Sequence, residues 1–306
     1  DIGSGAAADL ADIDGDLAFS GGVNIVGENS IGIAIEGNSA GDVRILQGGT
    51  VNTLGSGSTA VSVTGDVDGA VSIAGQVRSN GFRINDRASQ AIFEALADRE
   101  ASDVAENSRL AGAAVIIAGS VRDGVFIAGP TSTNSAGGSV QVTGSAPALA
   151  IQPGENASGP VTIGEVVYEE PDTSEGAEEG DLVTVERGYG LVIDGNVNAA
   201  GVFDGIDTRA ILISGRDVNG NIQAVILAEA GMQVTGTATA TTFDGHAQTI
   251  TIGEGTQMAG INNSGTISAL VFRGYDGDGF GDPVYGQGTA VALSIESGSD
   301  VGRIDN

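Results

Sequence analysis

The pattern of hydrophobic and polar positions along this chain is dominated by one five-residue motif. The motif is an apolar residue, any residue, an apolar residue, any residue and glycine, and it occurs ten times. Its copies are Val23–Gly27, Ile33–Gly37, Val61–Gly65, Val71–Gly75, Val115–Gly119, Val125–Gly129, Val140–Gly144, Leu191–Gly195, Ile211–Gly215 and Met232–Gly236. Apolar residues that alternate with a period of two indicate a β-strand with one buried face, and the glycine gives the backbone freedom to turn.

The spacing of these motifs predicts a stack of repeated coils. Three neighbouring pairs begin ten residues apart, and the later copies at residues 191, 211 and 232 lie 20 and 21 residues apart. Short strands that return at such intervals are typical of a β-solenoid. We therefore predict an all-β chain that forms a single parallel β-solenoid (β-helix) array over residues 1–306, with two strands in each coil of about 20–22 residues.

Two segments interrupt this pattern. In residues 79–111, five apolar residues have the i, i+3, i+4, i+7, i+8 spacing of a helix: Ala88, Ala91, Ile92, Ala95 and Leu96. This spacing predicts a helical insertion against the side of the solenoid. In residues 165–187, the first part, 165–181, contains eight acidic residues and no basic residue, which predicts an acidic loop in solvent. The remaining residues would form about twelve coils and a rod about 60 Å long.

A longer repeat occurs near the C-terminus. Four residues recur after 43 positions, which we interpret as two coils: Ile252, Met258, Ile261 and Asn263 match Ile295, Val301, Ile304 and Asn306. We expect Asn262, Asn263, Asp305 and Asn306 to stack between coils as a polar ladder. Because the second copy stops at Asn306 and the chain starts at Asp1 without Met, we expect the sequence to be a segment of a longer protein.

Composition and charge restrict the function. The chain has 40 acidic residues, 12 arginines, no lysine and a formal net charge of −28. Nucleic acids and anionic membrane surfaces are therefore unsuitable partners, since both require clustered cations. The absence of lysine and cysteine excludes Schiff-base chemistry, disulfides and thiolate sites. No apolar stretch reaches 18 residues, so we predict no membrane insertion of this segment.

Three segments of the repeat text resemble a known family. They are GYGLVIDGNVNAAGVFDGID (188–207), AAVIIAGSVRDGVFIAG (113–129) and MAGINNSGTISA (258–269). They are similar to the β-helical passenger domains of autotransporters, which are large exported surface proteins of Gram-negative bacteria. The resemblance extends over nearly the whole chain. It implies an extracellular β-solenoid at the cell surface, associated with the outer membrane, and transfers no catalytic residue.

Two acidic clusters are candidate calcium sites. Asp276, Asp278 and Asp282 lie in a glycine-rich run, and Asp12, Asp14 and Asp16 form a smaller cluster of the same kind. Carboxylates on a glycine-rich turn can converge on a hard cation such as Ca²⁺, because glycine permits the tight backbone path that such loops need. The alternative is an acidic surface turn, because Asp and Gly are common turn residues.

The sequence contains few residues that could carry out enzymatic catalysis. His246 is the only histidine, and no G-x-S-x-G motif accompanies it, so we expect a loop histidine. The competing hypothesis is a polysaccharide lyase or hydrolase on a β-helix scaffold. Its candidate residues are Asp204, Asp207, Arg209, Arg216 and Asp217. The absence of Trp argues against a sugar-binding cleft.

The sequence therefore predicts a non-enzymatic, exported, structural or adhesin-like β-solenoid. Open strand edges can pair with further strands, so we expect homo-oligomers or polymers through the ends or sides of the solenoid, as a surface layer or filament. A host surface or a polysaccharide is the other expected partner.

Overall fold

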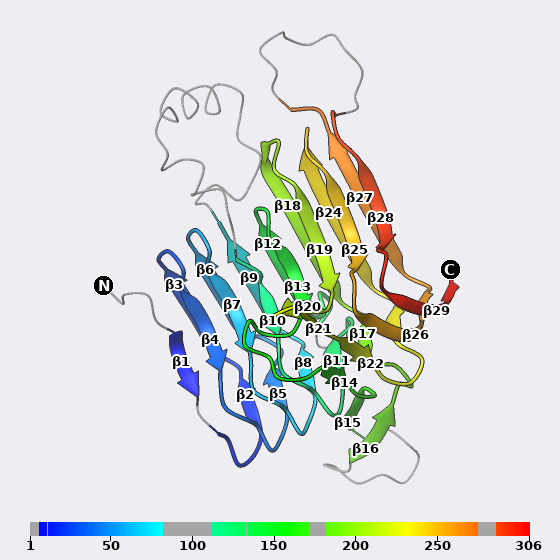
Figure 1. Ribbon diagram of the computed structural model, residues 1–306. Helices are drawn as coiled ribbons and strands as arrows, with labels where there is room; N and C mark the ends of the chain where they lie inside the picture. The colour runs from blue at the N-terminus through cyan, green and yellow to red at the C-terminus, as the bar shows by residue number, and fades with distance from the viewer. Residues whose placement is uncertain (1–5, 11, 82–111, 132–133, 172–181, 275–285) are drawn as a thin grey trace.

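All regular elements of the described chain are β-strands. The computed structural model describes residues 6–10, 12–81, 112–131, 134–171, 182–274 and 286–306 (Figure 1). Within these ranges there is no helix, and therefore none of the length and apolarity needed to span a bilayer. The predicted all-β fold is confirmed for this part of the chain.

Most strands belong to three parallel sheets, which we name A, B and C. Sheet A contains, in spatial order, β1 (Ala6–Leu10), β4 (Ile31–Ile35), β7 (Thr59–Val63), β10 (Val115–Ile117), β13 (Pro147–Ile151), β19 (Thr208–Ile213), β25 (Ala247–Ile252) and β28 (Ala290–Ile295). Sheet B contains β2 (Leu17–Phe19), β5 (Val43–Ile45), β8 (Val71–Ile73), β11 (Val125–Ile127), β17 (Leu191–Ile193), β23 (Met232–Val234) and β26 (Thr256–Asn263). β26 also pairs with β29 (Asp300–Asp305) and with β22 (Val225–Leu227), which pairs with β14 (Val161–Ile163). Sheet C contains β3 (Gly22–Val26), β6 (Thr50–Leu54), β9 (Gln76–Asn80), β12 (Ser139–Thr143), β18 (Asn196–Asp204), β24 (Thr237–Phe243) and β27 (Thr266–Phe272).

Each complete coil passes through sheet A, then sheet B, then sheet C, and the next coil lies beside it (Figure 1). This arrangement is a parallel β-solenoid, as predicted. The predicted coil length is wrong, however, because each coil has three sides. Ile33 lies beside Val61, 28 positions away. Ile252 lies beside Ile295, so the 43-residue repeat is one coil and not two.

The longer coils also shorten the solenoid. Sheet A has eight strands, and at about 4.8 Å between neighbours they span about 34 Å rather than the expected 60 Å. The ten-residue spacing of the motifs is the separation along the chain between neighbouring sheets: from sheet A to sheet B for the pairs at 61 and 71 and at 115 and 125, and from sheet C to sheet A for the pair at 23 and 33. Most strands of sheet C escaped detection because they carry polar residues on both faces, as in Gln76–Asn80.

The core consists of aliphatic columns that run along the solenoid. In sheet A the register aligns one such column: Ile33, Val61, Val115, Leu149, Ile211 and Ile250. All six side chains are almost fully buried. Each contributes about 1.5–3 kcal/mol relative to an exposed side chain. Stacking of like residues therefore supplies a core without large aromatic side chains.

Sheets A and C also contact each other through small polar side chains. Ser58 Oγ donates to the carbonyl of Gly27, and Ser79 Oγ donates to the carbonyl of Ser58, both at 2.6 Å. Thr249 makes the same type of bond to Ser268 at 2.6 Å. These bonds satisfy hydroxyls that would be costly to bury without partners.

Many glycines that close the motifs are required by stacking. A Cβ on Gly195 would overlap the carbonyl oxygen of Gly138, and a Cβ on Gly119 or Gly236 would overlap the preceding coil in the same way. None of these residues has a positive φ. The expected reason, freedom to turn, is therefore wrong at these positions. Close approach of successive backbones is the reason.

The predictions for the two interruptions have different outcomes. Residues 79–80 end strand β9, and residues 82–111 lie outside the described chain, so the structure gives no support for a helical insertion. Within residues 165–187, β15 (Val167–Pro171) pairs with β16 (Leu182–Glu186) as an antiparallel hairpin instead of a loop, and 172–181 are not described. A second hairpin joins β20 (Arg216–Val218) to β21 (Asn221–Gln223). Its turn, Asn219–Gly220, has positive φ at both residues, as Asn-Gly hairpin turns require.

Candidate functional surfaces

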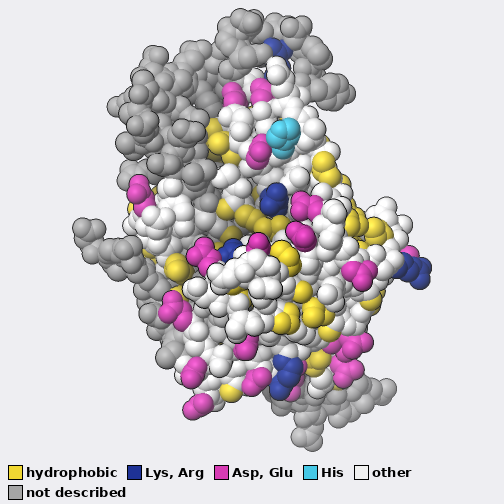
Figure 2. All heavy atoms as spheres, in the orientation of Figure 1, with side chains coloured by type: hydrophobic (Ala, Val, Ile, Leu, Met, Phe, Trp, Pro, Cys, Tyr) yellow, Lys and Arg dark blue, Asp and Glu magenta, His cyan; other side chains and the backbone are white. Residues whose placement is uncertain are grey.

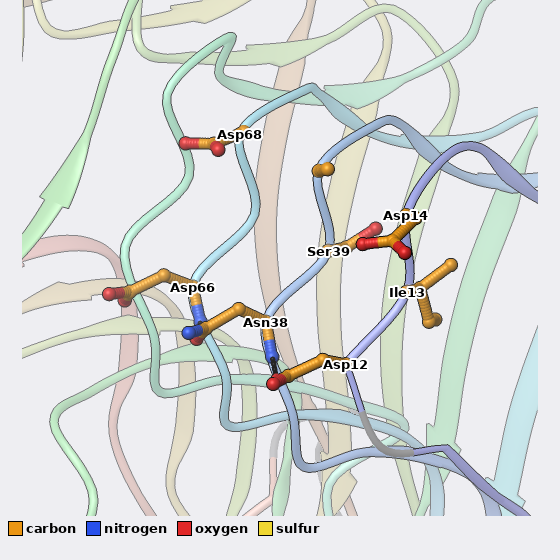
Figure 3. A pocket seen from close by; sticks show the side chains of 8 residues that line it. Asp12, Ile13, Asp14, Asn38, Ser39, Asp66 and Asp68 are labelled. Atoms are coloured by element: carbon orange, nitrogen blue, oxygen red, sulfur yellow. Dashed lines mark hydrogen bonds between the residues drawn. The ribbon is translucent and has the colours of Figure 1, made fainter.

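A row of polar side chains follows the corner between sheets A and B (Figure 3). Asp12 Oδ1 accepts the backbone N–H of Asn38 at 2.8 Å, and Asn38 Oδ1 accepts that of Asp66 at 3.0 Å. Asp66 Oδ1 in turn accepts the N–H of Ser120 at 2.8 Å. Each side chain binds the backbone of the following coil, so this row is an inter-coil ladder that fixes the corner.

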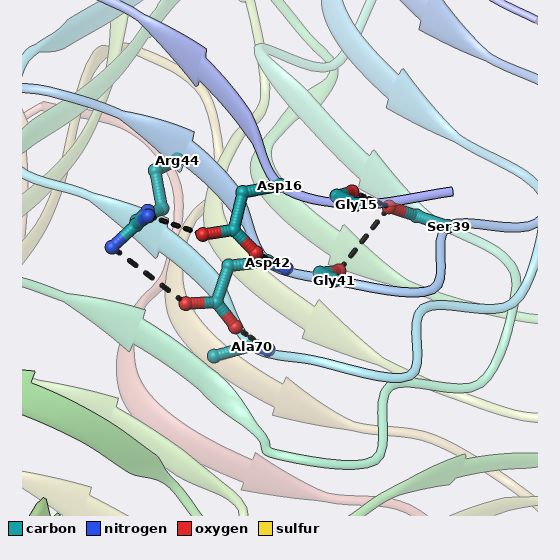
Figure 4. Close-up of polar contacts among 7 residues, drawn as sticks. All are labelled: Gly15, Asp16, Ser39, Gly41, Asp42, Arg44 and Ala70. Carbon is teal, nitrogen blue, oxygen red and sulfur yellow. Dashed lines mark hydrogen bonds and ion pairs between the residues drawn. The ribbon is translucent and has the colours of Figure 1, made fainter. Parts of the chain in front are cut away.

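A second row lies beside the first (Figure 4). Asp16 Oδ1 accepts the N–H of Asp42 at 3.0 Å, and Asp42 Oδ1 accepts that of Ala70 at 2.9 Å. Arg44 pairs with Asp16 at 2.5 Å and with Asp42 at 3.8 Å. These ion pairs are partly exposed, and such pairs contribute only about 0–1 kcal/mol each.

The first ladder borders an acidic groove of about 350 Å³. Its lining consists of Asp12, Ile13, Asp14, Asn38, Ser39, Ala40, Asp66 and Asp68. Across the described chain, no group of three or more His, Cys, Asp or Glu side chains is placed to hold a metal ion. Asp12, Asp14 and Asp16 are therefore not brought together around one point. Asp276, Asp278 and Asp282 lie outside the described residues, so calcium binding there stays a prediction.

The candidate enzymatic residues are also part of inter-coil contacts. Asp207 Oδ1 accepts the backbone N–H of His246 at 2.8 Å. The His246 ring lies 2.7 Å from Thr289 Oγ1 on the next coil, measured from Nδ1. Arg209 donates from Nε and an Nη atom to Gln248 Oε1 at 3.1 and 2.7 Å. These partners are backbone and neutral side chains, so Asp207 and Arg209 hold the coils together.

Two of the three remaining candidates, Arg216 and Asp217, stabilise the second hairpin. Asp217 Oδ1 accepts the N–H of Gly220 at 2.7 Å and thereby closes the turn between β20 and β21. Arg216 donates to Gln152 Oε1 at 2.7 Å and connects the hairpin to the preceding coil. Asp204 ends strand β18.

The β15–β16 hairpin is anchored to the outer surface of sheet B. Phe126 of β11 and Val192 of β17 form a small apolar cluster with Val166, and Tyr168 packs against it. The rings of Phe126 and Tyr168 are stacked with centroids 4.9 Å apart. The hairpin is thus held by a hydrophobic contact of its own, separate from the main core.

An arginine completes this anchor. Arg187 forms a two-pronged pair with Asp194, at 2.7 and 3.2 Å, and donates to Gln233 at 2.9 Å. Its guanidinium also lies 5.8 Å from the ring centroid of Phe126. The hydrogen bond to Asp194 raises the pKa of Arg187, and desolvation by burial opposes this shift. The sequence did not single out this residue, because the charged pair is defined by a hairpin that was expected to be a loop.

Charge is distributed unevenly over the molecule. Acidic side chains greatly outnumber basic ones on the surface shown in Figure 2. The outward side chains of sheet C, which we name face C, are an exception. Over the first five positions of each strand they are, by strand alternation, Gly22, Asn24, Val26, Thr50, Asn52, Leu54, Gln76, Arg78, Asn80, Ser139, Gln141, Thr143, Asn196, Asn198, Ala200, Thr237, Thr239, Thr241, Thr266, Ser268 and Leu270. Among these positions only Arg78 is charged. Two of them, Asn80 and Thr143, are buried. Three strands continue beyond these positions, and their ends, Asp204, Phe243 and Phe272, lie side by side.

Amide side chains stack along face C as well. Asn52 donates to Asn24 at 3.0 Å, and Arg78 donates to Gln141 at 2.8 and 3.1 Å. The sequence does contain a sign of face C, because threonine alternates with alanine in Thr237–Thr241. We did not predict a strand from it, since its inward residues are alanines.

The asparagine ladder expected near the C-terminus lies in sheet B and not on face C. Asn263 donates to Asn306 at 2.5 Å, which confirms the stacking expected for this pair. Asn262 instead donates to the hydroxyl of Tyr189 at 3.0 Å.

The register and the corner ladders define the class of the chain as a parallel β-solenoid. Comparison with protein families, curated proteins and solved structures finds no match.

Proposed function

We propose that this chain is a non-enzymatic, structural or adhesin-like rod of an exported cell-surface protein, and that it assembles with further copies. The observation that carries the proposal is the unbroken register of sheet A over eight strands, with aliphatic columns inside and ladders at the corners. Such a stack is a rigid spacer whose surface repeats along its axis. The resemblance of its repeats to autotransporter passenger domains supports the location outside the cell.

The charge of the chain supports the same location. A net charge of −28 keeps an exposed protein soluble and prevents adsorption to anionic surfaces. The competing lyase or hydrolase hypothesis gains no support from Asp207 and Arg209, because both side chains bind the next coil.

Two measurements test this proposal. In intact source cells, protease added outside should degrade the chain, whereas a cytoplasmic protein should survive; full protection would refute the surface location. In parallel, the purified chain is incubated with a panel of acidic polysaccharides. We expect no chain cleavage. Turnover that is lost in Asp207→Asn or Arg209→Gln, with the fold retained, would favour the enzyme hypothesis instead.

A further inference from the structure

Face C is a surface on which two copies of this acidic chain can meet. Elsewhere, corner acids such as Asp12, Asp16 and Asp66 project next to each other, so a second copy would bring carboxylates against carboxylates. At 0.1 M ionic strength such repulsion acts over about 10 Å. Over the first five positions of each strand, face C has no acidic residue and its one charged residue is Arg78. The one acid in the strands of sheet C is Asp204, at the end of β18 beside Phe243.

The chemistry of face C is self-complementary. Side-chain amides and hydroxyls both donate and accept hydrogen bonds, so a surface made of them can pair with itself. The amides are already ordered by stacking, as in the bond from Asn52 to Asn24 at 3.0 Å. Less side-chain freedom is then lost on association.

Two exposed apolar side chains specify a relative orientation. Val26 and Leu270 are 68% and 41% exposed. The register places them at opposite ends of one outward column of face C. β12 is the central strand of the sheet, with three strands on each side. A two-fold axis parallel to β12 therefore brings Val26 of one copy onto Leu270 of the other, at both ends.

We propose that face C is a lateral interface through which two copies of the chain pair with antiparallel solenoid axes. The proposal rests on the proposed function and deepens it, because it names the surface and the symmetry of self-assembly. Seven strands at about 4.8 Å and five residues at about 3.3 Å give about 550 Å² per copy. This area corresponds to a weak, transient contact that becomes effective when many copies share a surface.

Charge variants test the interface. In this symmetry Asn52 faces Thr239 of the other copy, so Asn52→Asp with Thr239→Asp places acids opposite each other twice. We expect sedimentation velocity over a concentration series to show association weakened by about tenfold or more. The control with the same added charge is Asn156→Asp with Ser158→Asp, in the exposed loop before β14, which should associate like the unsubstituted chain. Asn198→Asp should strengthen association, because Asn198 faces Arg78 of the other copy.

Crosslinking tests the orientation independently of any effect of charge on folding. The chain contains no cysteine, so Val26→Cys and Leu270→Cys are each single thiols. A mixture of the two variants should form a disulfide-linked pair under mild oxidation, and neither variant alone should do so. Crosslinking of each variant with itself would overturn the antiparallel arrangement.

A chain that stays monomeric at every concentration but binds a neutral polysaccharide such as dextran would overturn the interface and assign face C to a carbohydrate. The two proposals can fail separately. If the purified chain pairs but intact cells protect it from external protease, the interface stands and the surface function is refuted.

Discussion

At the scale of the residue, polar side chains at the corners act mainly on the next coil. Asp12, Asp66 and Asp207 each accept a backbone N–H from the coil that follows. A corner interrupts the hydrogen bonding of the sheets, so its N–H groups need other acceptors. Asp and Asn are suitable because their short side chains reach neighbouring backbone groups. The acidic composition is therefore partly a consequence of how the coils are joined.

Substitution of Asp66 tests this role of the corner acids. Asp66→Ala removes the acceptor for Ser120 N–H, and we expect the free energy of unfolding to fall by about 0.5–1.5 kcal/mol in urea titrations. Asp66→Asn keeps an acceptor oxygen, as Asn38 does on the preceding coil, and should lose less. Asp68→Ala, which removes an acid from the same groove but not from the ladder, is the control. Equal losses in all three variants would contradict the ladder.

The Arg187–Asp194 pair provides a prediction for pH. The pKa of Arg187 is raised in the folded chain, so its contribution is complete below the ordinary arginine pKa and is lost only as pH rises through the higher folded value. We therefore expect the hairpin to stay anchored from neutral to moderately alkaline pH. Amide hydrogen exchange in Val167–Pro171 and Leu182–Glu186 should show constant protection over this range, after correction for intrinsic rates.

Arg187→Lys should weaken the same anchor at any of these pH values. Lysine cannot reproduce the two-pronged pair or lie flat over Phe126. The two strands should exchange about 5- to 30-fold faster, equivalent to 1–2 kcal/mol. Arg216→Lys, in the other hairpin, is the matched control. Unchanged protection in Arg187→Lys would mean that the apolar contact alone holds the hairpin.

At the scale of the element, the sequence was sufficient for strands with a strict apolar alternation and insufficient for the others. Most strands of sheets A and B, such as Val71–Ile73, are predicted because their inward residues are Val, Ile or Leu. Much of sheet C was missed because its contact with sheet A leaves room only for small side chains such as Ser79 and Ala240. The three-sided coil could not be deduced from a pattern that marks only two of the seven strands of sheet C, β3 and β12. Which acids bind backbone and which face solvent depends on the register, which the sequence does not show.

Glycine substitutions test the stacking of elements. In Gly195→Ala the new Cβ would overlap the carbonyl of Gly138, so the two coils must separate locally. We expect the free energy of unfolding to fall by about 1–3 kcal/mol or more. Gly154→Ala is the control, because no atom lies within 4 Å of its Cβ position. Thermal melts of the two variants should therefore differ clearly, and equal melting temperatures would contradict close stacking at this column.

At the scale of the whole molecule, the fold separates charge from contact surfaces. Acids gather at corners such as Asp12–Asp16 and Asp66–Asp68, while the outward residues of sheet C are almost uncharged. Parallel stacking produces this separation, because like charges on adjacent strands would face each other at about 4.8 Å. Corners tolerate like charges because the acidic side chains there bind backbone N–H groups or extend into solvent. A repeated acidic edge beside a neutral sheet follows from these two requirements.

This charge distribution makes stability dependent on ions. The chain has 40 acids and only 12 arginines, so the excess acids repel each other, and salt screens this repulsion. The melting temperature should therefore rise between 0.01 and 0.15 M NaCl, where the screening length falls from about 30 to about 8 Å.

The predicted calcium site requires more than screening. At equal ionic strength, CaCl₂ should raise the melting temperature above the NaCl value, and a chelator should reverse the difference. The triple variant Asp276→Asn, Asp278→Asn and Asp282→Asn should remove it, whereas Asp12→Asn, Asp14→Asn and Asp16→Asn should not, because those three side chains do not share a metal position. Identical melts in the two salts would refute calcium binding and leave general screening as the only effect of cations on this chain.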